Sequence, residues 1–204
     1  MSDRPFFSII IPSFNGESRI YDALESCAEQ NFQDFEIIVA CDSCTDHTAE
    51  VARRHGAVVV EGSWHRDGLA RNAGLDVARG KWILFLDDDD WWLHEFCLQQ
   101  IWETICKSND NTDVVMFDII WHGQCYCRQS ELHYEKMTAG HCFRREFIGD
   151  IRWSDQKYSA DTNFFDQLLM VHRNPNFVFM KVPIYFYNYM RPGSLSDKHC
   201  KGEL

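Results

Sequence analysis

The sequence predicts an α/β fold built on a mostly parallel central sheet, and three observations support this prediction. Short apolar, β-branched segments alternate with segments of helical periodicity through the first half of the chain. Proline or glycine marks several of the junctions between them. With 204 residues, 45% of them apolar and 25% charged, the chain is long and apolar enough for one ordinary core. We therefore expect a single domain over residues 1–204, with helices on both faces of the sheet.

The first half is expected to alternate strands and helices. Short apolar runs predict strands at 7–11, 35–40, 58–60 and 82–86, and Pro12 closes the first of them. Apolar residues at helical spacing predict helices at 18–30, 45–54 and 68–78. Thr45 or Asp46 would cap the second helix, and Gly56 and Gly80 would follow the second and third.

The second half has a less regular pattern. Residues 94–106 and 161–172 have helical periodicity, and residues 113–119 are apolar enough for a strand. We expect one or two strands over 177–189, broken at Pro183, and a hairpin or flap over the polar segment 121–137. His141 is expected to begin a helix.

Charge and cysteine usage exclude several classes of protein. The net charge of −11 argues against a nucleic-acid backbone or an anionic membrane surface as a general partner. No apolar run reaches the ~18 residues that span a bilayer, and residues 1–5 lack the features of a signal peptide. We expect a cytoplasmic protein and leave peripheral association with the inner face of the membrane open. Cys41/Cys44 forms a CxxC, but Cys41 ends an apolar strand and Cys44 follows in the turn, and Cys125/Cys127 has the wrong spacing for a zinc site, so reduced thiols are expected.

Three polar segments follow the predicted strands, at 12–16, 42–46 and 87–90. In open parallel sheets, ligands bind beyond the carboxyl ends of the strands, so we expect these segments to meet in one site. The chain contains neither GxGxxG nor GxxxxGK[ST], so a glycine-rich dinucleotide or phosphate loop is not predicted.

Four consecutive aspartates, Asp87 to Asp90, follow the fourth predicted strand directly. In an extended chain the side chains of residues i and i+2 point the same way, so Asp87 and Asp89 would share one face. Two converging carboxylates suit Mg²⁺ or Mn²⁺, which keep open positions for water and phosphates. An acidic loop that caps the next helix is the alternative, and it stays open on the residues alone.

A series of motifs resembles the family 2 glycosyltransferases. They are, in chain order, FFSIIIPSFNG, ACDSCTD, GLARNAG, ILFLDDDDWW, CFRREF, SADTNFFDQLL and VPIYFYNYMRPGSLS. The resemblance covers nearly the whole chain and is weakest over 121–137. It implies a GT-A (Rossmann-like) fold with a small C-terminal acceptor-side subregion. Residues 1–92 would then form the nucleotide-sugar-binding half and residues 93–204 the acceptor-side half.

The resemblance also implies roles for individual residues. Asp161 matches the catalytic base and Asp89 the ligand of the Mn²⁺ or Mg²⁺ cofactor. Asp42 matches the aspartate that binds the base of the donor, and Asn72 lies in the motif beside the donor. The expected donor-binding residues are Pro12, Phe14, Asn15, Asp42, Arg66, Arg71, Asp87, Asp88, Arg191, Ser194 and Ser196. Asp161 has an alternative role as a helix N-cap. Departures from the family pattern, which we interpret as tuning, are Cys41, Cys44 and Ala160.

The expected function is a metal-dependent, inverting sugar transfer from a nucleotide-diphosphate sugar, with a UDP-sugar favoured. The acceptor would be a hydroxyl of a glycan, a lipid-linked molecule or another molecule, in polysaccharide or glycoconjugate biosynthesis. A sugar-phosphate nucleotidyltransferase is one alternative, but PSFNGESRI lacks the lysine that such chemistry usually places there. A non-catalytic nucleotide-sugar or glycan-binding module is another, and the presence of Asp87, Asp89 and Asp161 argues against it.

Overall fold

The structure is a computed structural model that describes residues 4–121, 124–126, 137–156, 159–188 and 201. Its strands are β1 (Phe7–Ser13), β2 (Phe35–Asp42), β3 (Val58–Gly62), β4 (Trp82–Phe85), β5 (Trp91–Trp92), β6 (Val114–Trp121), β7 (Gln124–Tyr126), β8 (His141–Arg144) and β9 (Phe177–Tyr187). Its helices are α1 (Ile20–Ala28), α2 (Thr48–Arg54), α3 (Asp67–Val77), α4 (Cys97–Lys107), α5 (Arg145–Ile148) and α6 (Ala160–Val171).

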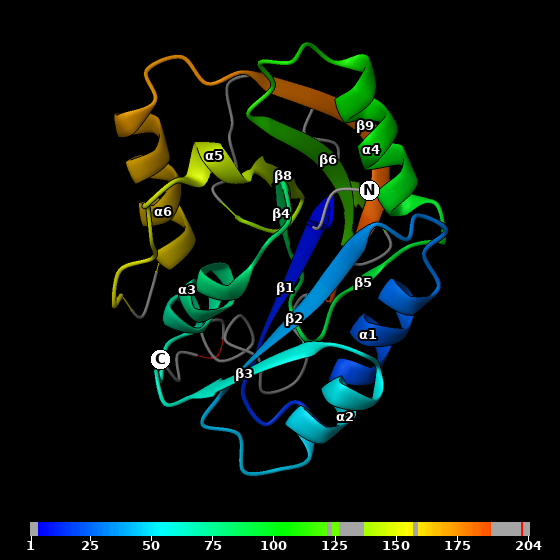
Figure 1. The fold of residues 1–204 in the computed structure, drawn as a ribbon, viewed down its shortest axis with the longest axis vertical. Coiled ribbons are helices and arrows are strands. Elements are labelled where there is room, and N and C mark those ends of the chain that lie inside the picture. The colour runs from blue at the N-terminus through cyan, green and yellow to red at the C-terminus, as the bar shows by residue number, and fades with distance from the viewer. Residues whose placement is uncertain (1–3, 122–123, 127–136, 157–158, 189–200, 202–204) are drawn as a thin grey trace.

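The strands form one mixed sheet in the order β3-β2-β1-β4-β8-β6-β9-β5, and β7 pairs with β6 (Figure 1). The first four strands in this order are parallel neighbours. Strand β8 is antiparallel to both β4 and β6, whereas β6 and β9 are parallel. The predicted α/β fold with a mostly parallel sheet is therefore confirmed, and each antiparallel pair among the described strands includes a strand of the second half.

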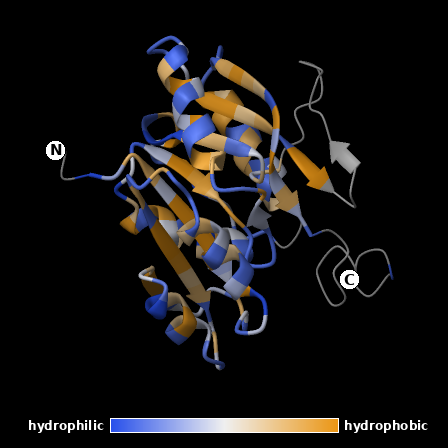
Figure 2. Ribbon diagram, turned by 90° about the vertical axis from the view of Figure 1, so that its right-hand side faces the viewer, coloured by the Kyte–Doolittle hydropathy of each residue, from blue (hydrophilic) through white to orange (hydrophobic). Residues whose placement is uncertain are grey.

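Helices cover both faces of this sheet because successive residues of a buried strand point to opposite sides. Ile9 and Ile11 of β1 join the apolar cluster that contains side chains of α1, α2 and α4. Ile10 joins the cluster that contains side chains of α3, α5 and α6. Figure 1 shows these two sets of helices on opposite sides of the central strands, and Figure 2 shows the strands as the most hydrophobic part of the fold.

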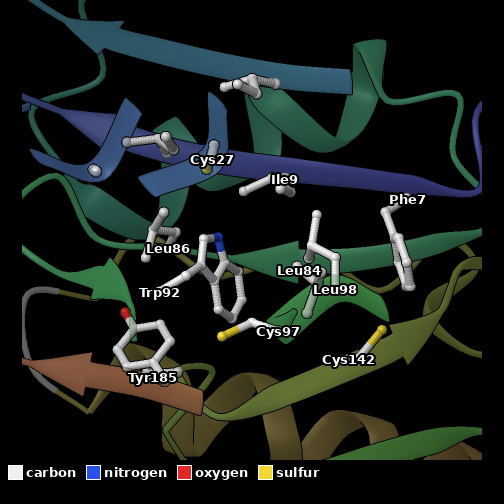
Figure 3. Close-up of a cluster of buried hydrophobic side chains, with 14 of the residues drawn as sticks. Phe7, Ile9, Cys27, Leu84, Leu86, Trp92, Cys97, Leu98, Cys142 and Tyr185 are labelled. Carbon is white, nitrogen blue, oxygen red and sulfur yellow. The ribbon is translucent and has the colours of Figure 1, made fainter. Parts of the chain in front are cut away.

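The apolar cluster under α1 and α4 anchors both ends of the segment that carries the aspartates 87–90. Leu86 and Trp92, which flank residues 87–91, are both buried in it, and Tyr185 of β9 packs edge-to-face on Trp92 at 5.7 Å between ring centroids. Figure 3 shows Trp92 between Leu86 and Cys97, with Tyr185 beside it. Full burial of one large apolar side chain stabilises a fold by about 1.5–3 kcal/mol, so both ends of the segment are firmly anchored.

Three expectations for the second half are corrected by the structure. His141 is buried at the start of β8 and does not begin a helix. Residues 177–187 form a single strand that continues through Pro183. This is possible because the register with β6 shifts beside Asp118, which pairs with Pro183, and a bulge tolerates a residue without an N–H. The short strand β5 follows the aspartates directly, where no strand was expected.

The segment expected to be a hairpin or flap is partly described. Strand β6 extends to Trp121 and pairs antiparallel with β7, as expected for a hairpin. Residues 122–123 and 127–136 lie outside the described residues. Among the helices that the structure describes, none is long and apolar enough to cross a membrane.

Candidate donor and catalytic site

The carboxyl ends of β1, β2 and β4 bring the three predicted polar segments into contact. Ser13, the last residue of β1, donates its hydroxyl hydrogen to Asp88 Oδ2 at 2.5 Å. Beyond β2, the Thr45 N–H donates to the side-chain oxygen of Asn15 at 2.8 Å. Asn15 adopts a positive φ of 47°, a conformation that asparagine tolerates better than most residues. The segments 12–16, 42–46 and 87–90 therefore meet as the strand order predicts.

The aspartates form a turn, in which the Asp90 N–H donates to the Asp87 carbonyl oxygen at 3.1 Å. The expectation of an extended segment is therefore wrong, because the chain reverses direction here, whereas a common face for Asp87 and Asp89 stays a prediction. Asp88 and Asp90 are buried, whereas Asp87 and Asp89 are half-buried. We call residues 87–90 the aspartate turn.

Two arginines from different helical segments neutralise the first half of the aspartate turn. Arg71 of α3 donates to Asp87 at 2.6 Å, and Arg19, which precedes α1, donates through Nε to Asp88 at 2.7 Å. Arg19 also donates to the carbonyl oxygens of Phe14 and Asn15, both at 2.8 Å. The Arg19 guanidinium thus links the turn after β1 to the turn after β4. Its positive charge reduces the repulsion among the aspartates, for which the neighbouring sequence offers no cation.

Strand β9 supplies the donors for the other end of the aspartate turn. The Tyr185 hydroxyl donates to Asp90 Oδ2 at 2.5 Å, and the Asn188 N–H donates to Asp90 Oδ1 at 2.8 Å. The same hydroxyl oxygen accepts the Asp87 N–H at 3.3 Å. Burial raises the pKa of Asp90 well above its ordinary value, and the charge of Asp87 adds to this rise. Asp90 and Tyr185 are both fully buried, so this end of the turn is part of the core.

Electrostatic coupling places the predicted base beside the aspartate turn. Burial, together with the charges of Asp89 and Asp161, raises the pKa of Asp87 to about 6 against the effect of Arg71. Burial alone lowers the pKa of Arg71, but the charges of Asp87 and Asp161 outweigh burial and raise that pKa above its ordinary value. Arg71 bonds Asp87 and lies over the ring of Trp153, whose N–H donates to Asp161, so the predicted cation site and the predicted base lie on either side of contacts made by Arg71 and Trp153.

Asp161 is the second residue of α6, and hydrogen bonds orient its carboxylate. Oδ2 accepts the Thr138 N–H at 2.9 Å and the Thr138 hydroxyl at 3.0 Å. Oδ1 accepts the indole N–H of Trp153 at 3.0 Å. The N-cap position of α6 belongs to Ser159, which has a left-handed conformation. The alternative role of Asp161 as an N-cap is therefore wrong.

Asp42, the predicted ligand of the donor base, closes the loop that leads into α3. Oδ1 accepts the backbone N–H groups of Trp64 and His65 at 2.7 and 2.9 Å, and Oδ2 accepts that of Arg66 at 3.0 Å. Arg66 is the N-cap residue of α3, so Asp42 positions the start of this helix. Only 6% of Asp42 is exposed, and its contact with a base stays a prediction.

The other predicted donor-binding residues differ in exposure. Phe14 is 57% exposed at the tip of the turn after β1, whereas Pro12 is buried inside β1 opposite Ala40. Arg66 forms an ion pair with Asp155 at 3.0 Å. Three predicted residues lie outside the described residues: Arg191, Ser194 and Ser196.

The aspartate turn fits a hard divalent cation that is held by one or two carboxylates. Mg²⁺ and Mn²⁺ prefer oxygen ligands and commonly combine one or two carboxylates with substrate phosphates. In the part of the chain that the structure describes, no three His, Cys, Asp or Glu side chains group as a complete metal site. Asp88 and Asp90 are buried in bonds to other elements, so the half-buried Asp87 and Asp89 are the side chains that would face a cation.

The cysteine pair beside this site consists of free thiols in the structure. Burial raises the pKa of Cys41 to about 12, and the neighbouring Cys44 contributes to this shift. Cys44 donates to the Ser13 carbonyl oxygen at 3.4 Å. Cys41 is therefore an inert, protonated thiol at neutral pH. Of the second pair, Cys127 lies outside the described residues.

Several residues of the site were not found from the sequence. The bonds of Asn72 to the backbone of Trp153 are one example, while its expected place beside the donor stays a prediction. Trp153 and Thr138 hold Asp161, and neither belongs to a recognised motif. A signal for Trp153 exists in the sequence, because a tryptophan in a polar loop usually has a partner for its N–H.

Comparison with known proteins finds sequences that are similar to this chain. The family model for glycosyl transferase family 2 matches residues 8–182 of the chain. EpsH of Bacillus subtilis (strain 168), which is named as a glycosyltransferase, is 30% identical over 222 residues. The matched region covers 91% of this chain and 61% of EpsH, so the chain spans about three fifths of that relative.

Solved structures share the fold. TarS residues 1–349 from S. aureus, in complex with UDP-GlcNAc, superpose with a TM-score of 0.79 and 21% identity, covering 94% of this chain and 60% of that chain. Glucosyl-3-phosphoglycerate synthase from Mycobacterium tuberculosis, in complex with Mn²⁺, UDP and phosphoglyceric acid, gives a TM-score of 0.70 and 16% identity, covering 98% and 75%. At these identities the likeness concerns the fold.

Proposed function

The chain belongs to glycosyl transferase family 2, and we propose that it transfers a sugar from a nucleoside-diphosphate sugar to an acceptor hydroxyl with inversion at the anomeric carbon. The observation that carries this proposal is the arrangement around Arg71. This buried guanidinium bonds Asp87 of the aspartate turn, and it is also under the influence of Asp161. Trp153, which packs under Arg71, also donates to Asp161, and this supports a single site for the predicted cation and the predicted base, as a single displacement requires.

Asp161 is the group that takes the proton in this reaction. As the acceptor oxygen forms its bond to the anomeric carbon, the acceptor proton passes to the Asp161 carboxylate. The bond between the anomeric carbon and the diphosphate oxygen breaks, and its electron pair leaves with the nucleoside diphosphate. One displacement of this kind inverts the anomeric carbon and needs no nucleophile from the protein.

The remaining residues stabilise the leaving group or bind the donor. A Mn²⁺ or Mg²⁺ ion held by Asp89, with Asp87 beside it, would supply Lewis-acid stabilisation of the diphosphate charge. We assign Arg191, Ser194 and Ser196 to the diphosphate by their match to the family. Phe14, Asn15 and Asp42 are assigned to the nucleoside by the same match, and the exposed Phe14 ring is accessible to a base.

The proposed donor is a UDP-sugar, because the structural neighbours described above were solved with UDP or UDP-GlcNAc. The acceptor is proposed to be a hydroxyl of a glycan or a lipid-linked molecule, in polysaccharide or glycoconjugate biosynthesis. We propose that this reaction takes place in the cytoplasm.

The structure disfavours a nucleotidyltransferase. Such an enzyme needs cationic groups after β1 to bind a triphosphate, and the turn of this chain offers Arg19. That guanidinium is committed to Asp88 and to two backbone carbonyl oxygens, so it is not available for phosphates.

A test of the proposal measures the release of nucleoside diphosphate from UDP-glucose, UDP-N-acetylglucosamine and GDP-mannose, with Mn²⁺ or with EDTA. Water replaces the unknown acceptor in this assay. We expect turnover with at least one donor that requires the metal. Asp89→Ala should abolish metal-dependent binding of the donor, measured by thermal shift, whereas Asp161→Asn should bind the donor and lose turnover.

Asp22→Asn is the matched control, because Asp22 is an exposed acid of α1 away from the site. Wild-type binding of a nucleotide sugar without any turnover would favour the non-catalytic module. Full turnover by the Asp161→Asn protein would remove Asp161 from the mechanism.

A further inference from the structure

Trp153 is a buried tryptophan whose ring orientation is fixed by packing. It lies in the loop between α5 and α6 and is only 2% exposed. Its ring stacks on Phe164 of α6 with 3.8 Å between centroids and an interplanar angle of 0°. Phe85, at the end of β4, packs edge-to-face against it at 4.9 Å. The ring therefore joins the end of β4, just before the aspartate turn, to the helix that carries Asp161.

Helix α3 holds the backbone of the same residue. The Asn72 side chain donates to the Trp153 carbonyl oxygen at 2.8 Å and accepts the Trp153 N–H at 2.9 Å. Gly68, one turn earlier on α3, allows the close approach, because a Cβ there would lie 2.8 Å from Trp153 Cβ. Arg71 lies over the indole ring at 6.0 Å from its centroid. Adjacent residues of one helix, Arg71 and Asn72, thus hold Asp87 and Trp153 respectively.

The hydrogen bonds of Asp161 leave a specific position for a proton. A carboxylate has about four lone-pair positions, two on each oxygen. Thr138 occupies both positions of Oδ2 with its N–H and its hydroxyl. Trp153 occupies one position of Oδ1. An indole nitrogen donates and never accepts, so it cannot take the acceptor proton itself. The described residues make no bond at the second position of Oδ1, and this is where an acceptor hydroxyl would bind.

We propose that Trp153 is a positioning residue, whose indole N–H fixes the Asp161 carboxylate so that Oδ1 receives the acceptor proton at a set place relative to the aspartate turn. The inference rests on the proposed function, in which Asp161 is the base. Helix α3 links both parts of the site. Arg71 binds Asp87 of the aspartate turn, and Asn72 holds Trp153, which donates to Asp161. A displacement of about 1 Å at a reacting group costs on the order of 100-fold in rate.

Trp153→Phe keeps an aromatic ring beside Phe164 but removes the indole N–H together with part of the bicyclic ring, so a control with the same loss of ring is needed to separate this role from packing. We expect kcat for donor hydrolysis to fall ~10- to 100-fold, with unchanged KM for the donor and unchanged Mn²⁺-dependent UDP binding. Trp82→Phe is the matched control. Trp82 is equally buried, and its indole nitrogen has no hydrogen-bond partner among the described residues. Wild-type kcat in the Trp153→Phe protein overturns the inference.

A double-mutant cycle distinguishes positioning from a general structural role. If Trp153 acts through Asp161, adding Trp153→Phe to Asp161→Asn lowers kcat no further. Multiplied losses in the double variant overturn the inference. Thr138 provides the same test if the Trp153→Phe protein does not fold, because Thr138→Val removes the hydroxyl donor and Thr138→Ser keeps it. We expect kcat to fall in the valine variant and to recover in the serine variant, and equal activities contradict the proposal.

An NMR measurement tests the hydrogen bond without catalysis. In ¹H–¹⁵N spectra, the indole signal of Trp153 is the one of the seven tryptophan signals that Trp153→Phe removes. We expect Asp161→Asn to shift this signal and to leave that of Trp82 in place. An unshifted signal overturns the inference even where the wild-type enzyme is active. If the wild-type protein hydrolyses no nucleotide sugar, both the proposed function and the inference are refuted. If the wild type is active and the Trp153→Phe protein has the same kcat, only the inference is refuted.

Discussion

Replacing Arg71 by methionine should destabilise the protein substantially, because it leaves the Asp87 carboxylate without its cation. Arg71 is 4% exposed and donates to Asp87 at 2.6 Å. Breaking a buried ion pair by removing one partner costs about 3–5 kcal/mol. The Asp87 side chain is one-third exposed, so water screens it in part and the lower end of that range applies. The lost bond to Asp67 adds little, because that partner is 49% exposed.

The expected loss of about 3 kcal/mol corresponds to a fall of roughly 6–12 °C in Tm for a domain of this size. The measurement is urea unfolding at pH 8 without added metal, followed by tryptophan fluorescence. This pH lies above the Asp87 pKa of about 6, so the carboxylate is charged. A second variant, Arg71→Met with Asp87→Asn, should recover much of the loss because no unpaired charge remains.

The outcome that refutes this reasoning is a loss of less than about 0.5 kcal/mol, the range of neutral surface substitutions. An Asp87→Asn change that fails to restore stability would show instead that Arg71 acts through packing against Trp153. Both outcomes would also weaken the argument that α3 links the two parts of the site.

Two further substitutions test other parts of the network. Tyr185→Phe removes the hydroxyl that donates to Asp90 and should cost about 1–3 kcal/mol in urea unfolding, because a buried acceptor loses its partner; an unchanged midpoint would contradict this. Glu36→Gln should show a pH-dependent loss of stability. Although burial raises the pKa of Glu36, hydrogen bonds from Ser8 and Arg79 outweigh it and place the pKa below the ordinary 4.5. The stabilisation is therefore complete above that value and is lost as the pH falls through the lower, folded-state pKa. The difference in Tm between wild type and Glu36→Gln should shrink between pH 5 and pH 3, and a constant difference would refute it.

The elements that could be predicted from the sequence are those long enough to show an apolar run or a helical spacing of apolar residues. The expected strands 7–11, 35–40 and 82–86 all lie within or across observed strands, and they are apolar because helices cover both faces. Strands β5 and β8 are too short to show a period, and pairing with distant partners defines them. His141 begins β8 because β6 lies beside it, which is information that the local sequence lacks.

The location of the site was predictable, but the bonds inside it were not. Three polar segments after three strands were expected to meet, and these segments are in contact; that a ligand binds there stays a prediction. Asp42 was expected to face the donor base, whereas its carboxylate accepts three backbone N–H groups from the loop before α3. Such bonds depend on backbone turns such as that at His65, which has a φ of 56° and no clear signature in the sequence.

The aspartate turn shows why a motif does not reveal the role of each member. Hydroxyl groups that donate to it come from far along the chain: Ser13 is 75 residues before Asp88, and Tyr185 is 95 residues after Asp90. Because Asp87, Asp88 and Asp90 take donors from separate elements, the turn can hold consecutive acids at one strand end with less repulsion. These same bonds join β1, α3 and β9 at the point where the donor diphosphate is proposed to bind. The aspartate turn therefore also holds these elements together. The free energy of unfolding of any variant in it should be measured before an effect on turnover is assigned to chemistry.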